Sequence, residues 1–154
     1  MNEVAEKSGK VFGIMYNQRT NPCYQKIKEL VESGELGAIK RISWIITTWY
    51  RPQAYHDSGS WRSTWKTEGG GALINQNPHQ LDLWQWMFGM PDKITSFVSF
   101  GKYYDIEVED DVTAYLEYPN GATGVFVTTT ADLPGTNRFE VTLDKAKMVC
   151  ENDE

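Results

Sequence analysis

Runs of apolar and β-branched residues in the second half of the chain predict strands. They lie at 94–100, 108–118, 122–130 and 137–143, with a shorter run at 148–151. Within 108–118 apolar residues alternate with polar ones, so one face of that strand is expected to be buried. Pro119-Asn120-Gly121 follows this run and predicts a hairpin turn, because Asn-Gly accepts positive φ angles.

Two segments of the first half have the spacing of amphipathic helices. Apolar residues share one helical stripe over 22–33, where Asn21-Pro22 supplies a start signal and Gly34 a stop signal. A second helical segment follows the glycines at 69–71 and extends to Phe88. Both helices are expected to turn an apolar side toward the sheet.

The rest of the first half contains two candidate strands and a long loop. Residues 40–50 are rich in Ile, Thr, Trp and Tyr and predict a strand. Residues 51–68 show no period and predict a loop, of a length that is often functional. Residues 2–7 resemble the end of a helix that stops at Gly9, and residues 11–16 predict a short buried strand.

These elements together predict an α+β fold, an open and mainly antiparallel sheet with helices packed on one face. The strands that follow residue 94 are expected to form an antiparallel meander. The second face of such a sheet stays open, and a second copy of the chain in a homo-oligomer is expected to cover it.

Composition narrows the class of protein. The 154 residues suit one domain, and a net charge of −6 argues against a nucleic-acid or anionic-membrane surface. No apolar run approaches the roughly 18 residues of a membrane helix, and no signal peptide is recognised, so a cytoplasmic protein is expected.

Cys23 and Cys150 could bridge but are interpreted as reduced thiols. Residues 107–111 are expected to form an exposed acidic turn, not a cation site.

Candidate chemistry concentrates on the second helical segment. At about 100° per residue, Asn75, His79 and Asp82 share one stripe, and Gln76 joins them as a substrate-binding candidate. The apolar residues on the opposite side are expected to face the core: Leu73, Ile74, Leu81, Trp84 and Phe88. The polar stripe is therefore expected to face outward or into a cleft.

Pro78 interrupts this segment. Either the helix kinks there, or Asn77 begins a second helix in which Gln80 closes a capping box. In the second case His79 lies in the first helical turn, where the helix dipole favours a neutral imidazole that can act as a general base. A structural or surface histidine remains the alternative. No metal site is predicted, because His56 and His79 lack ligand spacing and no carboxylate cluster joins them.

Several short motifs occur in one order along the chain. They lie at 16–22, 33–37, 60–62, 69–73 with 79–82, 109–110 and 118–121. Each motif is weak alone, but the ordered series resembles the Gfo/Idh/MocA family of oxidoreductases. The resemblance extends from about residue 4 to residue 151.

The resemblance implies a two-domain enzyme, in which an N-terminal Rossmann domain binds NAD or NADP. Residues 1–16 would be the last helix and strand of that domain, and residues 17–154 the substrate and catalytic domain, truncated at its C-terminus. The Gly-x-Gly-x-x-Gly fingerprint that cradles the pyrophosphate of the cofactor is absent from this sequence. The chain by itself is therefore expected to be inactive.

The resemblance also implies roles for single residues. His79 matches the catalytic histidine, which helps to remove a hydroxyl proton as hydride leaves carbon for nicotinamide. The acid that many members carry four residues earlier is Asn75 here, which can hydrogen-bond a hydroxyl but cannot accept a proton. Asp82 matches an aspartate that supports the histidine or the substrate.

On the cofactor side, Trp61 and Arg62 match residues that approach the nicotinamide end, and Arg19 matches a residue near the cofactor cleft. The implied function is hydride transfer between NAD(P) and a sugar, a polyol or a related hydroxy or keto compound. Two alternatives remain open. One is a non-catalytic dimerisation domain, and the other is a cofactor-independent sugar-binding module that uses Trp49, Trp61, Trp65 and Tyr55.

Overall fold

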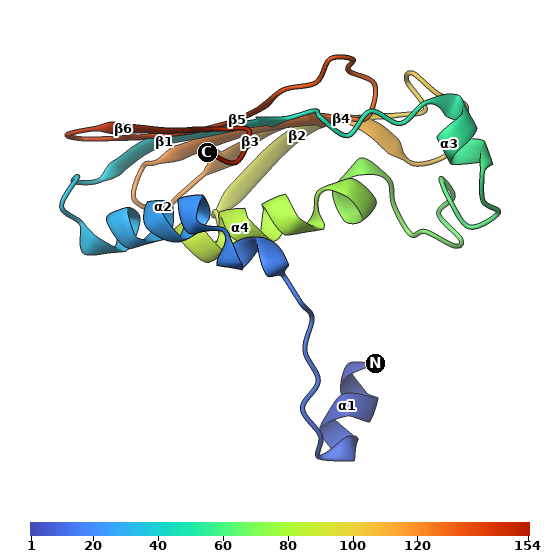
Figure 1. Cartoon of the computed structure of the whole chain (residues 1–154), viewed down its shortest axis with the longest axis horizontal. Helices are drawn as coiled ribbons and strands as arrows, with labels where there is room; N and C mark the ends of the chain where they lie inside the picture. Colours follow the sequence, from blue (N-terminus) through green and yellow to red (C-terminus); the bar gives the residue numbers. More distant parts are fainter.

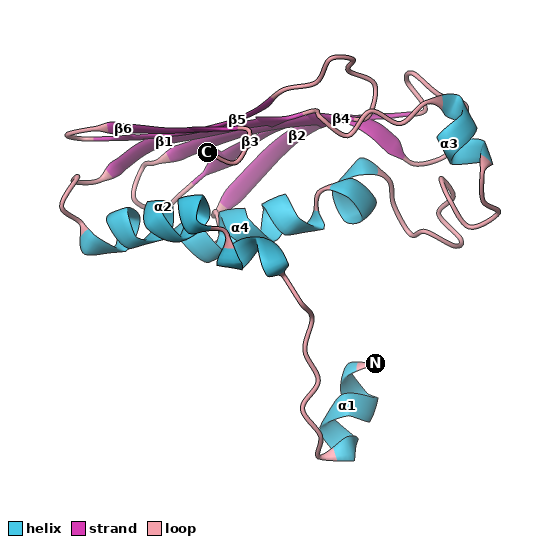
Figure 2. Ribbon diagram, viewed as in Figure 1, coloured by secondary structure: helices cyan, strands magenta, loops and turns pink.

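A six-stranded sheet with helices on one face forms the body of the protein, as the computed structural model of residues 1–154 shows (Figures 1 and 2). The strands are β1 Ile39–Ile46, β2 Lys93–Phe100, β3 Glu109–Glu117, β4 Thr123–Thr129, β5 Asn137–Leu143 and β6 Lys147–Glu151. The helices are α1 Asn2–Ser8, α2 Pro22–Ser33, α3 Gln53–Asp57 and α4 Pro78–Phe88, with a 3-10 turn η1 Asn17–Thr20 and a π turn η2 Ala72–Gln76. The predicted α+β class is confirmed.

The strand order is β2-β3-β4-β1-β5-β6, which differs from a simple meander. Strand β1 lies between β4 and β5, parallel to β4 and antiparallel to β5. Alternate residues of β1, namely Ile42, Trp44 and Ile46, are completely buried. This apolar face favours a central position for β1, because a strand in the middle of the sheet removes more of its apolar surface from water than a strand at the edge.

Helices α2 and α4 pack against one face of the sheet and enclose the core. Trp44 and Phe139 stack with ring centroids 4.6 Å apart, and Tyr24 from α2 and Leu83 from α4 close the cluster. Burial of one Trp side chain contributes about 4–6 kcal/mol to the free energy of folding, before the loss of chain entropy is counted. The opposite face of the sheet carries no helix (Figure 2).

Local signals set the ends of several elements as expected. The Asn21 side chain accepts a hydrogen bond from Cys23 N at 2.8 Å, and α2 stops at Gly34 with φ 68°. Gly121 has φ 83° in the hairpin between β3 and β4. No helix is both long and apolar enough to cross a membrane.

The N-terminal segment departs from the prediction. Helix α1 does end at Gly9, but residues 11–16 form no strand, and Val11 and Met15 are almost fully exposed. A strand needs a neighbour to accept its backbone hydrogen bonds, and no other strand lies beside this segment. In Figure 1 it leads away from the sheet to α1, which lies apart from the rest. The predicted strand at 40–50 also ends early, at Ile46, and the loop 51–68 contains α3.

Candidate functional site

A break at Asn77 divides the second helical segment into η2 and α4. Asn77 N donates to Ala72 O at 3.0 Å, which is the hydrogen bond of a π turn, and Pro78 occupies the first position of α4. The buried Asn77 side chain donates to Ala72 O at 2.7 Å and to Thr128 Oγ1 at 2.9 Å, so it anchors the break to β4. A new helix therefore begins after Asn77, but without a capping box, because Gln80 Oε1 has no partner.

The π turn also overturns the predicted stripe of Asn75, His79 and Asp82. Asn75 Nδ2 contacts Glu68, whereas Asp82 contacts Arg19. A π turn has more residues per turn than an α-helix, so a constant 100° step fails across Asn77. For the same reason Ile74, expected in the core, is 57% exposed. Leu81 is 41% exposed, because it borders an apolar hollow between α4 and β2 instead of a filled core.

The imidazole of His79 lies half-buried at the start of α4. Its ring meets the ring of Tyr16 edge to face, with centroids 5.9 Å apart. Nδ1 is buried without a hydrogen-bond partner, while Nε2 makes no hydrogen bond and is not buried. Tyr16 lines an open hollow of about 450 Å³ together with Phe12, Ile14 and Arg19. Nε2 is therefore the ring nitrogen of His79 that a ligand can reach, and Tyr16, which His79 contacts, borders the hollow.

Asp82 is occupied by Arg19 and makes no hydrogen bond to His79. The Arg19 guanidinium donates through Nε to Oδ2 at 2.7 Å and through Nη2 to Oδ1 at 2.6 Å. This hydrogen bonding raises the pKa of Arg19 above its usual value. Arg19 also lies over the ring of Trp86 at 5.6 Å. The pair holds η1, and with it Tyr16, against α4.

Glu109 fixes the glycine segment that precedes His79. Its carboxylate accepts hydrogen bonds from Gly71 N at 2.8 Å and from Leu73 N at 3.0 Å. A Cβ on Gly71 would lie 2.1 Å from Glu109 O, so only glycine allows η2 to approach β3 this closely. Glu109 is buried, which contradicts the expected exposed acidic turn.

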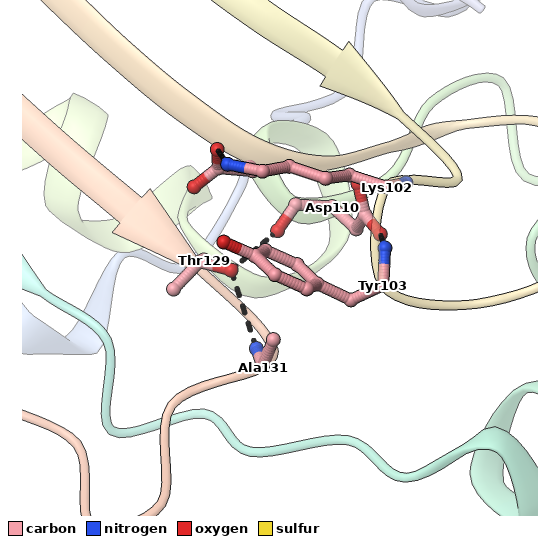
Figure 3. Close-up of polar contacts among 6 residues, drawn as sticks. Lys102, Tyr103, Asp110, Thr129 and Ala131 are labelled. Carbon is pink, nitrogen blue, oxygen red and sulfur yellow. Dashed lines mark hydrogen bonds and ion pairs between the residues drawn. The ribbon is translucent and has the colours of Figure 1, made fainter.

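Asp110 is also buried, and backbone N–H groups again hydrogen-bond its carboxylate (Figure 3). Its carboxylate accepts hydrogen bonds from Lys102 N at 3.0 Å and Tyr103 N at 2.8 Å. Its carbonyl oxygen accepts from Thr129 Oγ1 at 2.7 Å. Backbone N–H groups compensate both buried carboxylates, so these acids shape the structure next to the site. No group of three or more His, Cys, Asp or Glu side chains is arranged to hold a metal ion.

The loop 51–68 adds a polar network that the sequence did not predict. Ser63 N and Asn75 Nδ2 contact the two oxygens of Glu68. His56 Nδ1 and Ser63 Oγ lie 2.7 Å apart, and burial lowers the pKa of His56. Ser63 adopts φ 62°, which is unusual outside glycine. The sequence offers one signal of this network, His56 in a long loop that also contains two Trp and two Arg residues.

Gln76, the other substrate-binding candidate, faces a second group of loop residues. Its Oε1 accepts a hydrogen bond from Arg51 Nη2 at 3.0 Å. The guanidinium carbon of Arg62 lies 4.6 Å from the ring of Trp61 and 4.4 Å from the ring of Tyr55. Trp61 and Arg62, the two cofactor-side candidates of this loop, contact each other as neighbours in sequence. Arg51, which reaches the same ring of Tyr55, was not predicted.

Comparisons with known proteins find a family model and relatives that match this chain. Residues 24–149 match a family model described as the GFO/IDH/MocA C-terminal domain. YteT of Bacillus subtilis (strain 168), a protein named for its similarity to oxidoreductases, is 28% identical over 103 residues, which is 64% of this chain and 23% of YteT.

Two solved structures are similar in fold as well as in sequence. They are the WlbA dehydrogenases of Chromobacterium violaceum and Bordetella pertussis, both crystallised with NADH and UDP-GlcNAcA. Each is 26% identical, with TM-scores of 0.88 and 0.89. The match covers 99% of this chain and 44% of each dehydrogenase, so the chain spans less than half of their length.

Proposed function

The chain belongs to the Gfo/Idh/MocA family as its C-terminal domain, and from this premise we propose that it is the substrate-binding domain of an NAD(P)-dependent oxidoreductase. The proposed substrate is a sugar, a polyol or a related hydroxy or keto compound. One observation carries the proposal: Nε2 of His79 is free of protein partners, and the Tyr16 ring that His79 contacts lines an open hollow. The NADH and UDP-GlcNAcA bound to the two WlbA dehydrogenases support this class of cofactor and substrate.

In the proposed reaction His79 Nε2 accepts the proton of a substrate hydroxyl and returns it in the reverse direction. When bound, the nicotinamide supplies the hydride acceptor or donor. Asn75 cannot take a proton, so it has no part in a relay. Asn75 and Gln76 face the loop 51–68, and from that side they are proposed to hydrogen-bond the substrate. Asp82 acts through Arg19 and Tyr16, because its ion pair with Arg19 keeps the wall of the hollow against His79.

The residues present fit the nicotinamide end of NAD(P) but not the whole cofactor. Arg19, Trp61 and Arg62 would border that end, and the guanidinium of Arg62 makes no hydrogen bond within the chain. No glycine-rich fingerprint for the pyrophosphate occurs in the 154 residues. We therefore expect the chain alone to be inactive and to show no saturable NADH binding at micromolar concentrations in a fluorescence titration.

The exposed N-terminal segment supports the proposed division at residue 16. Val11, Ile14 and Met15 are at least 70% exposed, yet their sequence favours a buried strand. We propose that residues 11–16 pair with the sheet of a Rossmann domain and that residues 17–154 form the substrate domain. Protection of these amides from hydrogen exchange in the full-length protein, and its loss in the isolated chain, is the expected result.

Replacement of His79 tests the proposed role. In the full-length protein, His79→Ala is expected to lower turnover by about 10²–10⁴-fold, the usual contribution of a general base, without weakening NADH binding. Gln85→Ala is the matched control, because Gln85 is an exposed residue of the same helix. Unchanged turnover on every sugar and polyol tested, for a protein that is active in its original form, would remove His79 from the mechanism.

The uncovered face of the sheet supports a homo-oligomer. Phe97 on β2 is 77% exposed and Tyr115 on β3 is 43% exposed, and both belong to the face without helices. We propose that a second copy covers these residues. Phe97→Asp is expected to shift the protein to monomer in analytical ultracentrifugation, whereas Gln25→Asp, at an exposed position of α2 on the helix side of the sheet, serves as the charge control. An unchanged sedimentation coefficient for Phe97→Asp would contradict this arrangement.

We propose a cytoplasmic location, in which Cys23 and Cys150 are expected to remain reduced. Cys23 and Cys150 lie with Sγ atoms 2.9 Å apart, and both are free thiols. A reducing compartment keeps such a pair unbridged. Localisation of a fluorescent fusion of the full-length protein tests the assignment.

A further inference from the structure

The two cysteines of the chain lie side by side, although they are 127 residues apart in sequence. Cys23 is the second residue of α2, and Cys150 lies near the end of β6. Their Sγ atoms are 2.9 Å apart, and both thiols are free. Because a covalent S–S bond is about 2.05 Å long, the two sulfur atoms need to approach each other by only about 0.9 Å to form one.

Other contacts already hold the start of α2 against the end of β6. Tyr24, the residue after Cys23, is buried, and its hydroxyl donates a hydrogen bond to Asp153 Oδ1 at 2.6 Å. Asn137 Nδ2, on the neighbouring strand β5, donates to the same oxygen at 2.9 Å. The segments that carry the two thiols are therefore ordered before any bond forms, so a bond between them costs little additional chain entropy in the folded protein.

The two thiols differ in their contact with solvent. Cys150 is 2% exposed and lies opposite Phe139 in the pairing of β5 with β6, on the side of the core. Burial raises the pKa of Cys150, which keeps this thiol neutral. Cys23 is only half-buried, so it is the thiol that a small oxidant from solution meets first.

We propose that Cys23 and Cys150 form a redox modification site, in which a hydroperoxide converts the two thiols into a disulfide that ties α2 to β6. With hydrogen peroxide, deprotonated Cys23 Sγ attacks one oxygen, the O–O bond breaks, and the released hydroxide takes up the proton of Cys23 as water. Cys150 Sγ then attacks the sulfenic sulfur of Cys23, and the hydroxyl leaves as a second water with the proton of Cys150. Two thiols are oxidised, and one hydrogen peroxide is reduced to two water molecules.

The bond is conditional on the surroundings of the protein. A reducing compartment keeps the pair as thiols, and exposure to peroxide closes it. The disulfide restricts the unfolded chain, and this stabilising effect is large for sulfur atoms 127 residues apart. Oxidation is therefore expected to raise the melting temperature by about 5–10 °C. No step of this chemistry uses substrate or nicotinamide, so the inference stands apart from the proposed function.

The test treats the folded full-length protein with hydrogen peroxide, alkylates the remaining thiols and digests the product without a reductant. Mass spectrometry is expected to find the peptides of Cys23 and Cys150 joined, with two hydrogen atoms fewer than the reduced pair. The melting temperature is expected to rise by about 5–10 °C. Dithiothreitol should separate the peptides and reverse the shift.

Three variants separate the two thiols. Cys150→Ala leaves Cys23 without a partner, so its sulfenic acid should persist and react with dimedone, which should label little of the original protein. Cys23→Ser should give neither a linked peptide nor dimedone labelling at buried Cys150. The double variant Cys23→Ser/Cys150→Ala corrects the melting temperature for the oxidation of methionines. If Cys150→Ala does not fold, the linked peptide of the original protein and its loss in Cys23→Ser decide.

Three results would overturn the assignment. Oxidation of Cys23 to a sulfinic acid, while Cys150 stays a thiol, would show that the pair does not close. A Cys23–Cys150 bond that forms only in urea, or that lowers the melting temperature, would show that the folded protein does not accommodate it. A disulfide between the Cys23 residues of two copies, seen as a dimer on a non-reducing gel, would assign this thiol to a contact between copies.

Discussion

Glu109 is the residue whose replacement tests most directly how the segment before His79 is held. Its carboxylate accepts hydrogen bonds from Gly71 N and Leu73 N, and it is buried. In Glu109→Gln the amide keeps one acceptor oxygen and places an NH₂ group against the second N–H. One charge-assisted hydrogen bond is therefore lost and one buried donor is left unpaired, which costs about 1.5–3 kcal/mol. Glu109→Ala removes both acceptors, and the expected cost rises to about 3–5 kcal/mol.

Glu117→Gln is the matched control on the same strand. Glu117 pairs with Lys93 at 3.0 Å, but the two side chains are 44% and 67% exposed. Exposed pairs of this kind contribute between about zero and 1 kcal/mol. Stability is measured by urea unfolding, and hydrogen exchange at the amides of Gly71 and Leu73 reports the local effect. Equal stability of Glu109→Gln and Glu117→Gln, with exchange at both amides unchanged, would refute the role assigned to Glu109.

Three further results are expected. Burial lowers the pKa of His56 in the folded protein. As the pH falls below about 6.5, the unfolded chain therefore takes up a proton before the folded chain does, and the free energy of unfolding decreases. Less urea should be needed for unfolding at pH 5.5 than at pH 7.5, and His56→Gln should reduce this difference. Burial also raises the pKa of Cys150, so a thiol reagent at pH 8 should modify Cys150 more slowly than half-buried Cys23, and equal rates would contradict its burial. Gly71→Ala places a Cβ 2.1 Å from a carbonyl oxygen of β3 and should destabilise the protein by about 1–3 kcal/mol or more, whereas Gly13→Ala, with open space around it, should not change the melting temperature.

Part of the candidate site could be read from the sequence because it depends on single residues. The start of a helix after Asn77 needs only neighbours in sequence, and Pro78 is indeed the first residue of α4. The stripe through Asn75 failed because a π turn changes the angular step, and the sequence signals a break at Pro78 but not the π form of the turn before it. The network of Glu68 with Asn75 and Ser63 was missed because both of its contacts depend on the course of an irregular loop.

The sequence by itself determined the local elements. The Asn21 cap, the stop at Gly34 and the hairpin at Asn120-Gly121 depend on interactions within a few residues, and the alternation along 112–118 sets which face of β3 is buried. Only the tertiary structure decided which strands are neighbours and which loop residues meet. Strand β1 lies between β4 and β5, and Arg51 and Arg62 both contact the ring of Tyr55. Both arrangements depend on how segments far apart in the sequence pack together. That packing is set by the apolar surface that is buried and the chain entropy that is lost, and neither quantity can be read from a few neighbouring residues.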